Sequence, residues 1–273
     1  METKLNTEDL TNFEFITYEK RDHIAWVTIN RPQVMNALHV LAHNELFRVW
    51  QDFNSDPDSW LAIITGAGER AFSAGNDLKY TAELAASGNR PVAPPLGGFG
   101  GLTNPRFKLW KPVIAAVNGF ALGGGFELAM ACDIIVAADH AQFGLPEPRV
   151  GLVAGAGGMH RLPRQVPQKI AMGMLLTGKR LSAQEANRLG LVNEVVPLPE
   201  LLSTAERWAN EIMECAPLAV RGSKQAAMTG LDLPLEAALN NSYEWVERHM
   251  RSSDRMEGVT AFVEKRPPQW KGE

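Results

Sequence analysis

The chain has 273 residues, 45% of them hydrophobic and 21% charged, with a formal net charge of −4. This composition is ordinary for a packed globular protein, and the mild charge gives no support for a nucleic-acid partner. Glycine is unevenly distributed, because 17 of the 24 glycines fall between Gly66 and Gly158.

The cysteine count and the hydropathy pattern indicate in which cellular compartment the protein resides. Cys132 and Cys215 are too few for a disulfide framework and fit a reducing environment. The first ten residues have no signal-peptide pattern, and the most apolar stretch, 113–138, is interrupted by an Asn, a Glu and an Asp. We therefore predict a cytoplasmic protein without a membrane partner.

The first 65 residues alternate strand and helix patterns. Residues 13–18 and 23–29 predict two strands joined by a charged turn at 19–22. Apolar residues at helical spacing between positions 38 and 50 predict a helix, and the apolar run 61–65 predicts a buried strand.

A loop rich in glycine and proline, residues 84–106, interrupts this alternation, and a loop of this length is usually either functional or mobile. Residues 113–117 and 134–137 predict two more buried strands. Between them, three glycines at 123–125 precede a short helix at 126–131.

Beyond about residue 166 the pattern becomes helical. Ser182 and Glu185 have the spacing of a capping box, and Pro234 suits the first turn of a helix that runs through Val246. Strands alternating with helices, followed by helices alone, predict an α/β core with a helical C-terminal portion.

Several short motifs match known sites weakly. Residues 66–71 fit a dinucleotide-binding pattern, but a turn is the better interpretation; residues 173–180 resemble a P-loop but have helical character. His39 and His43 lack the neighbouring Glu of a zinc helix, and Ser73 lacks the first glycine of a nucleophile elbow.

Two carboxylates in apolar, glycine-rich surroundings form a stronger pattern. Glu127 follows three glycines and Glu147 lies in the segment Phe143–Pro148. Burial there would raise their pKa values toward neutrality, as general acid–base catalysis requires. The alternative is that each caps a helix or pairs with an arginine such as Arg149.

The glycines add candidate hydrogen-bond donors. Gly124, at a turn into a helix, can aim a backbone N–H at an anion, and Asn76 can supply a second N–H from another turn. The turn Gly155–Gly158 could hold a water or a carbonyl group. The alternative is that these glycines simply permit tight turns.

At these residues the sequence resembles the enoyl-CoA hydratase/isomerase family, also called the crotonase superfamily, from about residue 13 to 272. The motifs that carry the resemblance are Asn30–Pro32, Asn36–Leu38, Ala71–Lys79, Ala115–Gly125, Cys132–Asp133, Phe143–Glu147, Ser182–Ala186, Gly190–Pro197 and Glu257–Pro267.

The resemblance implies an α/β fold built as a spiral of ββα turns, with a C-terminal helical region that forms homotrimers or homohexamers. It divides the chain into a core at 1–200 that carries the thioester site, and a helical region at 201–273 for oligomerisation and CoA contacts. It implies an acyl-CoA thioester as substrate, with CoA carried by that substrate, and neither a separate cofactor nor a metal.

The resemblance also implies individual roles. The N–H groups of Asn76 and Gly124 would form the oxyanion hole for an enolate-like intermediate. The positions that match the family's CoA contacts are Ala74, Asp77, Lys79, Phe262 and Lys265, the last two often reaching a neighbouring subunit.

Members that hydrate enoyl-CoA carry both carboxylates, so the resemblance implies an enoyl-CoA hydratase. Glu127 and Glu147, helped by the N–H of Gly155, would hold the water, and Glu147 would give a proton to Cα. Near the 84–106 loop, we expect the acyl pocket to be lined by Phe99, Leu102 and Trp110.

Other functions remain open at this stage. The same scaffold supports isomerisation or dehydration of a specialised hydroxyacyl-CoA. A protein that binds CoA thioesters or RNA without catalysis, and a dinucleotide-dependent oxidoreductase, have less support in the sequence.

Overall fold

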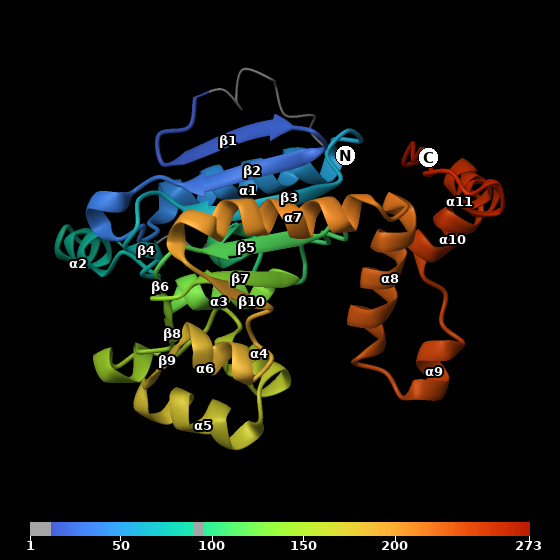
Figure 1. Cartoon of the computed structure of the whole chain (residues 1–273). Coiled ribbons are helices and arrows are strands. Elements are labelled where there is room, and N and C mark those ends of the chain that lie inside the picture. Colours follow the sequence, from blue (N-terminus) through green and yellow to red (C-terminus); the bar gives the residue numbers. More distant parts are fainter. Residues whose placement is uncertain (1–11, 90–94) are drawn as a thin grey trace.

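A computed structural model describes residues 12–89 and 95–273 (Figure 1). Its larger sheet has six strands in the order β1-β2-β3-β5-β7-β10, and all neighbours are parallel except β1 and β2. These strands are β1 (Ile16–Arg21), β2 (Ile24–Ile29), β3 (Leu61–Gly66), β5 (Val113–Val117), β7 (Ile134–Ala138) and β10 (Glu194–Val196).

A smaller sheet continues from the ends of these strands, in the order β4-β6-β8-β9, with β9 antiparallel to β8. Its strands are β4 (Ala71–Ser73), β6 (Phe120–Leu122), β8 (Gln142–Gly144) and β9 (Arg180–Ser182).

The two sheets arise from one repeated turn of the chain. A long strand of the first sheet leads into a short strand of the second and then into a helix. The turns are β3-β4-α2 (Leu78–Ala86), β5-β6-α3 (Gly124–Ala131) and β7-β8-η4 (the 3₁₀ helix Glu147–Val150). The predicted α/β fold with a spiral of ββα turns is thereby confirmed.

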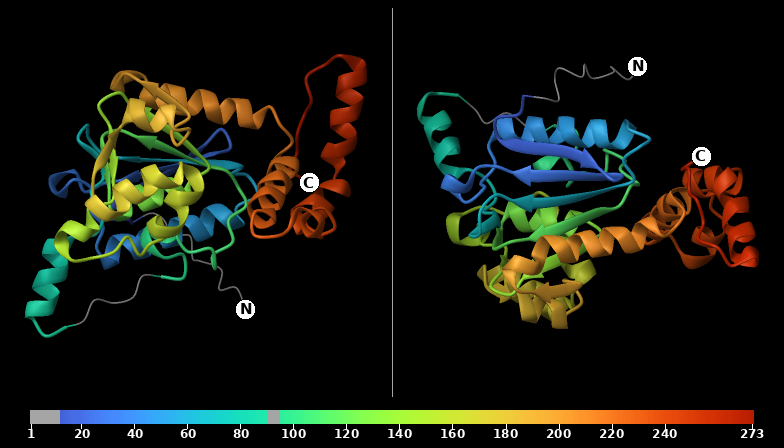
Figure 2. Two further views of the ribbon diagram at one scale, coloured as in Figure 1. Left: turned by 90° about the horizontal axis from the view of Figure 1, so that it is seen from below. Right: turned by 45° about the horizontal axis from the view of Figure 1, so that its top comes forward.

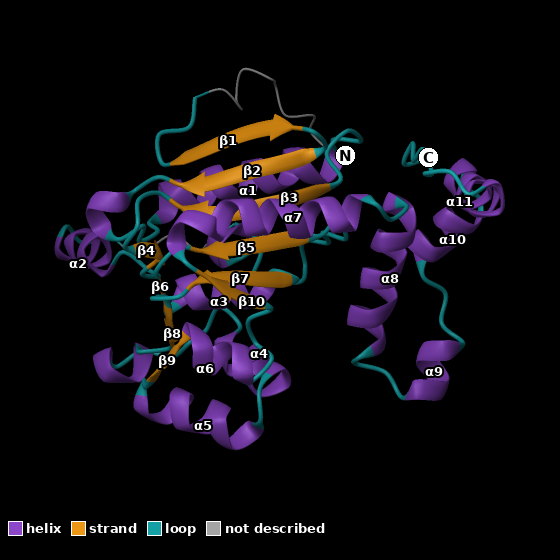
Figure 3. Ribbon diagram, in the orientation of Figure 1, coloured by secondary structure: helices purple, strands orange, loops and turns teal. Residues whose placement is uncertain are grey.

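Helices cover both faces of the larger sheet, which explains why its central strands read as continuous apolar runs (Figures 1 and 3). Every residue of β3 and β5 is buried. One face packs against α1 (Val40–Ser55), and the other packs against α7 (Leu201–Met213) through Leu201, Ala205 and Ala209.

Two of the expected elements have clearly different bounds in the structure. Strand β1 continues to Arg21 and the turn falls at Asp22 and His23, which both have positive φ, so the charged residues lie on an edge strand. The helix expected after Pro234 is broken into α9 (Leu235–Leu239) and α10 (Glu244–Met250). The Tyr243 hydroxyl donates to the Ala238 carbonyl across that break, which stabilises it.

The chain after β8 adds helices below the smaller sheet: α4 (Gly158–Gln165), α5 (Gln168–Thr177) and α6 (Ala183–Arg188). The capping box of Ser182 and Glu185 at the start of α6 is present as expected.

The last helices stand apart from both sheets, as Figures 1 and 2 show. They are α8 (Pro217–Gly230), α9, α10 and α11 (Ser253–Glu264). Because α7 covers the sheet, the predicted division at residue 200 separates this helix from the core to which it is packed. Among the described residues no helix is long and apolar enough to cross a membrane.

Candidate active site

The centre of the site is the N-terminus of α3, where two glycine turns meet. A Cβ at Gly75 would lie 2.9 Å from the backbone N of Gly124 and 2.7 Å from the carbonyl O of Leu122. Gly75 also has a φ of 91°, which side chains rarely adopt. Only glycine lets the β4–α2 turn approach α3 this closely.

This approach places two backbone donors side by side. Gly124 is the first residue of α3, so its N–H has no partner within the helix. The Leu38 N–H donates to the Gly75 carbonyl, and the Asp77 N–H donates to the Leu38 carbonyl. The N–H of Asn76, which lies between these two residues, makes no hydrogen bond with the described residues. The Asn76 side chain turns away and donates to Thr81. The arrangement suits an oxyanion hole.

Glu127 lies in the first turn of α3 and is only 2% exposed. Its Oε1 accepts a hydrogen bond from the N–H of Gly158 at 2.7 Å, and the backbone of Ala156 donates a second. Burial raises the pKa of Glu127 to about 7, and the negative charge of Glu147 adds to the rise, although the Gly158 hydrogen bond opposes it. Glu127 therefore titrates near neutral pH.

Glu147 begins the 3₁₀ helix η4 and lies beside the same helix end. Its Oε1 is 2.9 Å from the place where a Cβ on Gly123 would stand, and its Oε2 is buried without a hydrogen-bond partner among the described residues. Burial raises the pKa of Glu147 as well. Arg149 donates to the Thr177 carbonyl, and within the described chain no ion pair joins it to Glu147. The structure thus brings the two predicted carboxylates together.

In the glycine turn after η4, the residues that donate hydrogen bonds to Glu127 differ from the one that was predicted to act there. The N–H of Gly155 donates to the Val153 carbonyl at 2.8 Å, whereas the donors that reach Glu127 come from Ala156 and Gly158. The water-holding role of Gly155 therefore has no support in this geometry. Gly158 could have been found from the sequence, because it starts a helix after a glycine turn.

The three residues expected to line the acyl pocket lie in two places. The ring of Phe99 covers Gly124, since a Cβ there would be 2.4 Å from it, and it packs edge-on against His43. Leu102 and Trp110 line a pocket of about 510 Å³ between this loop, the C-terminal end of α3, α4 and α8. Neither Glu127 nor Glu147 lines that pocket.

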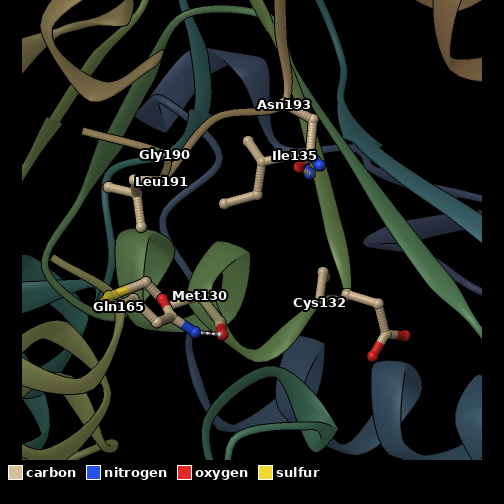
Figure 4. A pocket seen from close by; sticks show the side chains of 8 residues that line it. Met130, Cys132, Ile135, Gln165, Gly190, Leu191 and Asn193 are labelled. Atoms are coloured by element: carbon tan, nitrogen blue, oxygen red, sulfur yellow. Dashed lines mark hydrogen bonds between the residues drawn. The ribbon is translucent and has the colours of Figure 1, made fainter. Parts of the chain in front are cut away.

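A smaller hollow of about 250 Å³ lies at the C-terminal end of α3 (Figure 4). There the Gln165 side chain donates to the Met130 carbonyl, one of the last carbonyls of the helix. The hollow shares Met130, Cys132, Asp133 and Gln165 with the larger pocket, and it contains none of the predicted site residues.

The residues expected to contact CoA fall into two groups. Ala74, Asp77 and Lys79 lie together around the turn into α2, next to the oxyanion donors. Phe262 and Lys265 lie at the end of α11, on the opposite side of the molecule (Figures 1 and 2). One copy of the chain therefore does not gather all five residues.

The Asp77 side chain already has partners. It accepts from the Tyr80 N–H as the cap of α2 and forms an ion pair with Arg31 at 2.9 Å. Burial alone would raise the pKa of Asp77, but these two donors hold it below its ordinary value. Lys79 is exposed and, among the described residues, forms a single long ion pair with Glu83 at 3.9 Å, so a ligand can reach it.

The weaker motifs have structural explanations. His39 caps α1, and His43 accepts from the Gly100 N–H, so both are packed histidines. Ser73 is fully buried and donates to the Asn36 carbonyl. Residues 66–71 lead into strand β4 rather than a helix, and residues 173–177 lie inside α5, so neither forms a phosphate-binding loop.

Comparison with known proteins decides the family. A family model described as enoyl-CoA hydratase/isomerase matches residues 19–273. The chain belongs to this family. It is 43% identical to (E)-benzylidenesuccinyl-CoA hydratase of Thauera aromatica, over 94% of this chain and 99% of that protein. It is 45% identical to carnitinyl-CoA dehydratase of Escherichia coli K12, over 95% and 99%.

Solved structures agree with this family membership. The crystal structure of an enoyl-CoA hydratase from Mycobacterium marinum has a TM-score of 0.87 and 39% identity, covering 95% of this chain and 99% of that one. The enoyl-CoA hydratase/isomerase family and the crotonase fold, both expected from the motifs, are therefore confirmed. The prediction of a hydratase-type enzyme, a carbon–oxygen lyase, is confirmed by the named relatives.

Proposed function

We propose that the protein catalyses the reversible addition of water across the 2,3 double bond of an enoyl-CoA thioester. The observation that carries this proposal is the pair of carboxylates, Glu127 and Glu147, at the N-terminus of α3 beside the N–H groups of Asn76 and Gly124. Hydration needs an acid, a base and an oxyanion hole in one place, and this end of the helix offers all three.

The reaction follows from the protonation of the pair. Burial raises both pKa values, and the negative charge of Glu147 adds to the rise at Glu127. In the reactive form one proton lies on Glu147, whose Oε2 has no hydrogen-bond partner among the described residues. Glu127 is ionised, and its Oε1 is held by the Gly158 N–H.

In the forward direction the thioester oxygen accepts hydrogen bonds from the N–H groups of Asn76 and Gly124. Water adds through its oxygen to C3 while Glu127 takes one of its protons. The π electrons move toward the thioester, and the developing enolate takes a proton at C2 from Glu147. The pair still holds one proton afterwards, and the reverse sequence dehydrates a 3-hydroxyacyl-CoA.

The oxyanion hole accounts for much of the expected rate. Preorganised donors of this kind are worth about 3–4 kcal/mol each in the transition state. The dipole of α3 adds to this effect, because its positive end points at the oxygen that becomes negative.

We place the CoA group along the turn into α2, near Ala74, Asp77 and Lys79. A second copy would supply Phe262 and Lys265, since α11 of the same copy lies far from this turn (Figure 1). This proposal requires an assembly, in keeping with the expected homotrimer or homohexamer. Sedimentation velocity would test it, and a monomer that is fully active would contradict it.

A second candidate reaction is dehydration of a specialised hydroxyacyl-CoA. It is favoured by the 45% identity to carnitinyl-CoA dehydratase, and the same two carboxylates can run the elimination. Isomerisation of the double bond differs, because it adds no water.

The first test is a steady-state assay with crotonyl-CoA and longer or aromatic enoyl-CoA substrates. We expect loss of the enoyl thioester absorbance and a product heavier by one water. Glu147→Gln should lower kcat by about 10²–10⁴-fold, because a carboxamide cannot supply the proton. Glu19→Gln, which changes an exposed glutamate on β1, serves as the matched control.

Three outcomes would count against the proposal. A product of unchanged mass would indicate isomerisation. Wild-type rates in Glu147→Gln would remove Glu147 as the proton donor. Bound acyl-CoA without turnover on any substrate would indicate a binding protein.

A further inference from the structure

Arg161 lies on α4, one turn after the glycine turn that binds Glu127, and its guanidinium group joins two separate segments. Its Nη2 donates to the carbonyl of Thr103 at 2.9 Å, and its Nη1 donates to the carbonyl of Ala156 at 3.4 Å. Thr103 belongs to the loop that carries Phe99. Ala156 belongs to the turn that hydrogen-bonds Glu127.

The contact with the glycine turn is close. A Cβ on Gly157 would lie 2.1 Å from Nη1 of Arg161, so the guanidinium group lies directly against the backbone of this residue. Gly157 also has a φ of 113°, which suits glycine. The residues on either side of it, Ala156 and Gly158, supply the hydrogen bonds to Glu127.

The contact with the loop is equally specific. From the side of α1, Trp50 donates to the Gly100 carbonyl and His43 accepts from the Gly100 N–H. Arg161 holds the same loop from the side of α4, three residues further along. Phe99, which directly precedes Gly100, has its ring against Gly124, the proposed oxyanion donor.

We infer that Arg161 is a positioning residue, which couples the loop over the oxyanion hole to the turn that orients Glu127. This inference rests on the proposed function of Glu127. Because one planar group bonds both carbonyls, a shift of the loop moves the turn as well. The loop and the carboxylate then take their working positions together.

Electrostatics supports this geometry. The positive charge of Arg161 lowers the pKa of Glu127, and Glu147 is the other charged group that acts on it. The remaining titratable groups of α4 face elsewhere, since His160 is exposed and Arg164 donates to the His160 carbonyl. Arg161 is thus the cation that favours the ionised form of Glu127.

The test compares Arg161→Gln and Arg161→Lys with Arg207→Gln, an exposed arginine of α7 that pairs with Glu194 and Glu211. Arg161→Gln should lower kcat about 10–100-fold through misplacement of the reacting groups. It should also shift the pH–rate profile to higher pH, because the pKa of Glu127 rises when the positive charge is removed. Arg161→Lys should keep the pH profile and recover part of kcat.

A second measurement does not depend on activity. Hydrogen–deuterium exchange at residues 98–104 and 156–158 should become about tenfold faster in Arg161→Gln, as the loss of two hydrogen bonds implies. It should stay unchanged in Arg207→Gln. If the wild type hydrates no enoyl-CoA, the proposed function fails, and this exchange still tests the coupling.

The inference would be overturned by faster exchange at only one of the two segments, because coupling requires both. It would also be overturned by wild-type kcat in Arg161→Gln. Equal losses in the Gln and Lys variants, with an unchanged pH profile, would indicate a purely structural role.

Discussion

The neighbourhood of α3 and the C-terminal helices α8–α11 differ in how far their side chains are buried within one copy of the chain. Residues Gly124–Met130 of α3 are all buried, and glycine backbones touch there without side chains between them. The C-terminal helices instead expose large apolar side chains, namely Leu231, Leu235, Leu239, Phe262 and Val263. One copy of the chain completes the first region and leaves the second uncovered.

The difference indicates which property each region controls. Around α3, backbone donors and buried carboxylates are fixed by close packing, so small changes should act on the chemical step. In the C-terminal helices the exposed apolar surface is of a kind typical of protein–protein interfaces. Changes there should act on assembly and on CoA affinity and leave kcat nearly unchanged. The same kind of substitution in both regions tests this contrast.

The largest effect is expected from Gly124→Ala. Its Cβ would lie 2.4 Å from the ring of Phe99, so the ring or the helix end must move and the oxyanion donor moves with it. We expect kcat to fall about 10²–10³-fold in the hydration assay. The matched change in the other region is Gly230→Ala, where the new Cβ would meet only ordinary contacts at 3.5 Å.

Gly230→Ala should keep kcat within about twofold, because it lies in α8 and touches no reacting group. Comparable losses in the two variants would remove the contrast between the regions. Thermal unfolding of both proteins distinguishes loss of catalysis from loss of the fold.

A smaller effect concerns stability and pH. The pKa of Glu127 is raised from 4.5 to about 7 in the folded protein. Between these values the unfolded chain has lost the proton while the folded chain keeps it, so the free energy of unfolding falls as pH rises. The full cost, about 3 kcal/mol, is present above pH 7 and absent below about pH 4.5.

Glu127→Gln removes this titration. We therefore expect the variant to be more stable than the wild type at pH 8 and to lose that advantage at pH 4.5, while its hydratase activity is low. Denaturant unfolding at several pH values measures the difference. A constant difference across this range would show that the Glu127 environment is less desolvating than its burial indicates.

The contrast between the regions also explains what the sequence could reveal. Glu127 and Glu147 were predictable, because each stands in an apolar, glycine-rich segment where a carboxylate is unusual. Arg161 was not, because its partners are the backbone carbonyls of Thr103 and Ala156, and any residue type can supply those. Sequence patterns identify side chains with a chemical role more readily than side chains that hold a backbone in place.

Two further features have the same origin. The ring of Phe99, a residue expected in the acyl pocket, lies against Gly124, where the absence of a side chain leaves room for it. The helix expected to reach Val246 breaks at residues 240–243, where the Tyr243 hydroxyl binds the Ala238 carbonyl. Both outcomes depend on tertiary contacts that local periodicity does not contain.

The smallest effect should come from Phe262→Ser in α11. Its side chain is 86% exposed in one copy, and we expect it to contact CoA bound to another copy. The KM for crotonyl-CoA should rise about three- to tenfold, as for loss of one apolar contact of about 1 kcal/mol, with kcat nearly unchanged. Met256→Ser, which alters another exposed apolar residue of α11, is the control and should leave KM at the wild-type value. A fall in kcat without a rise in KM would place Phe262 with the chemical step, and the contrast between the two regions would then fail.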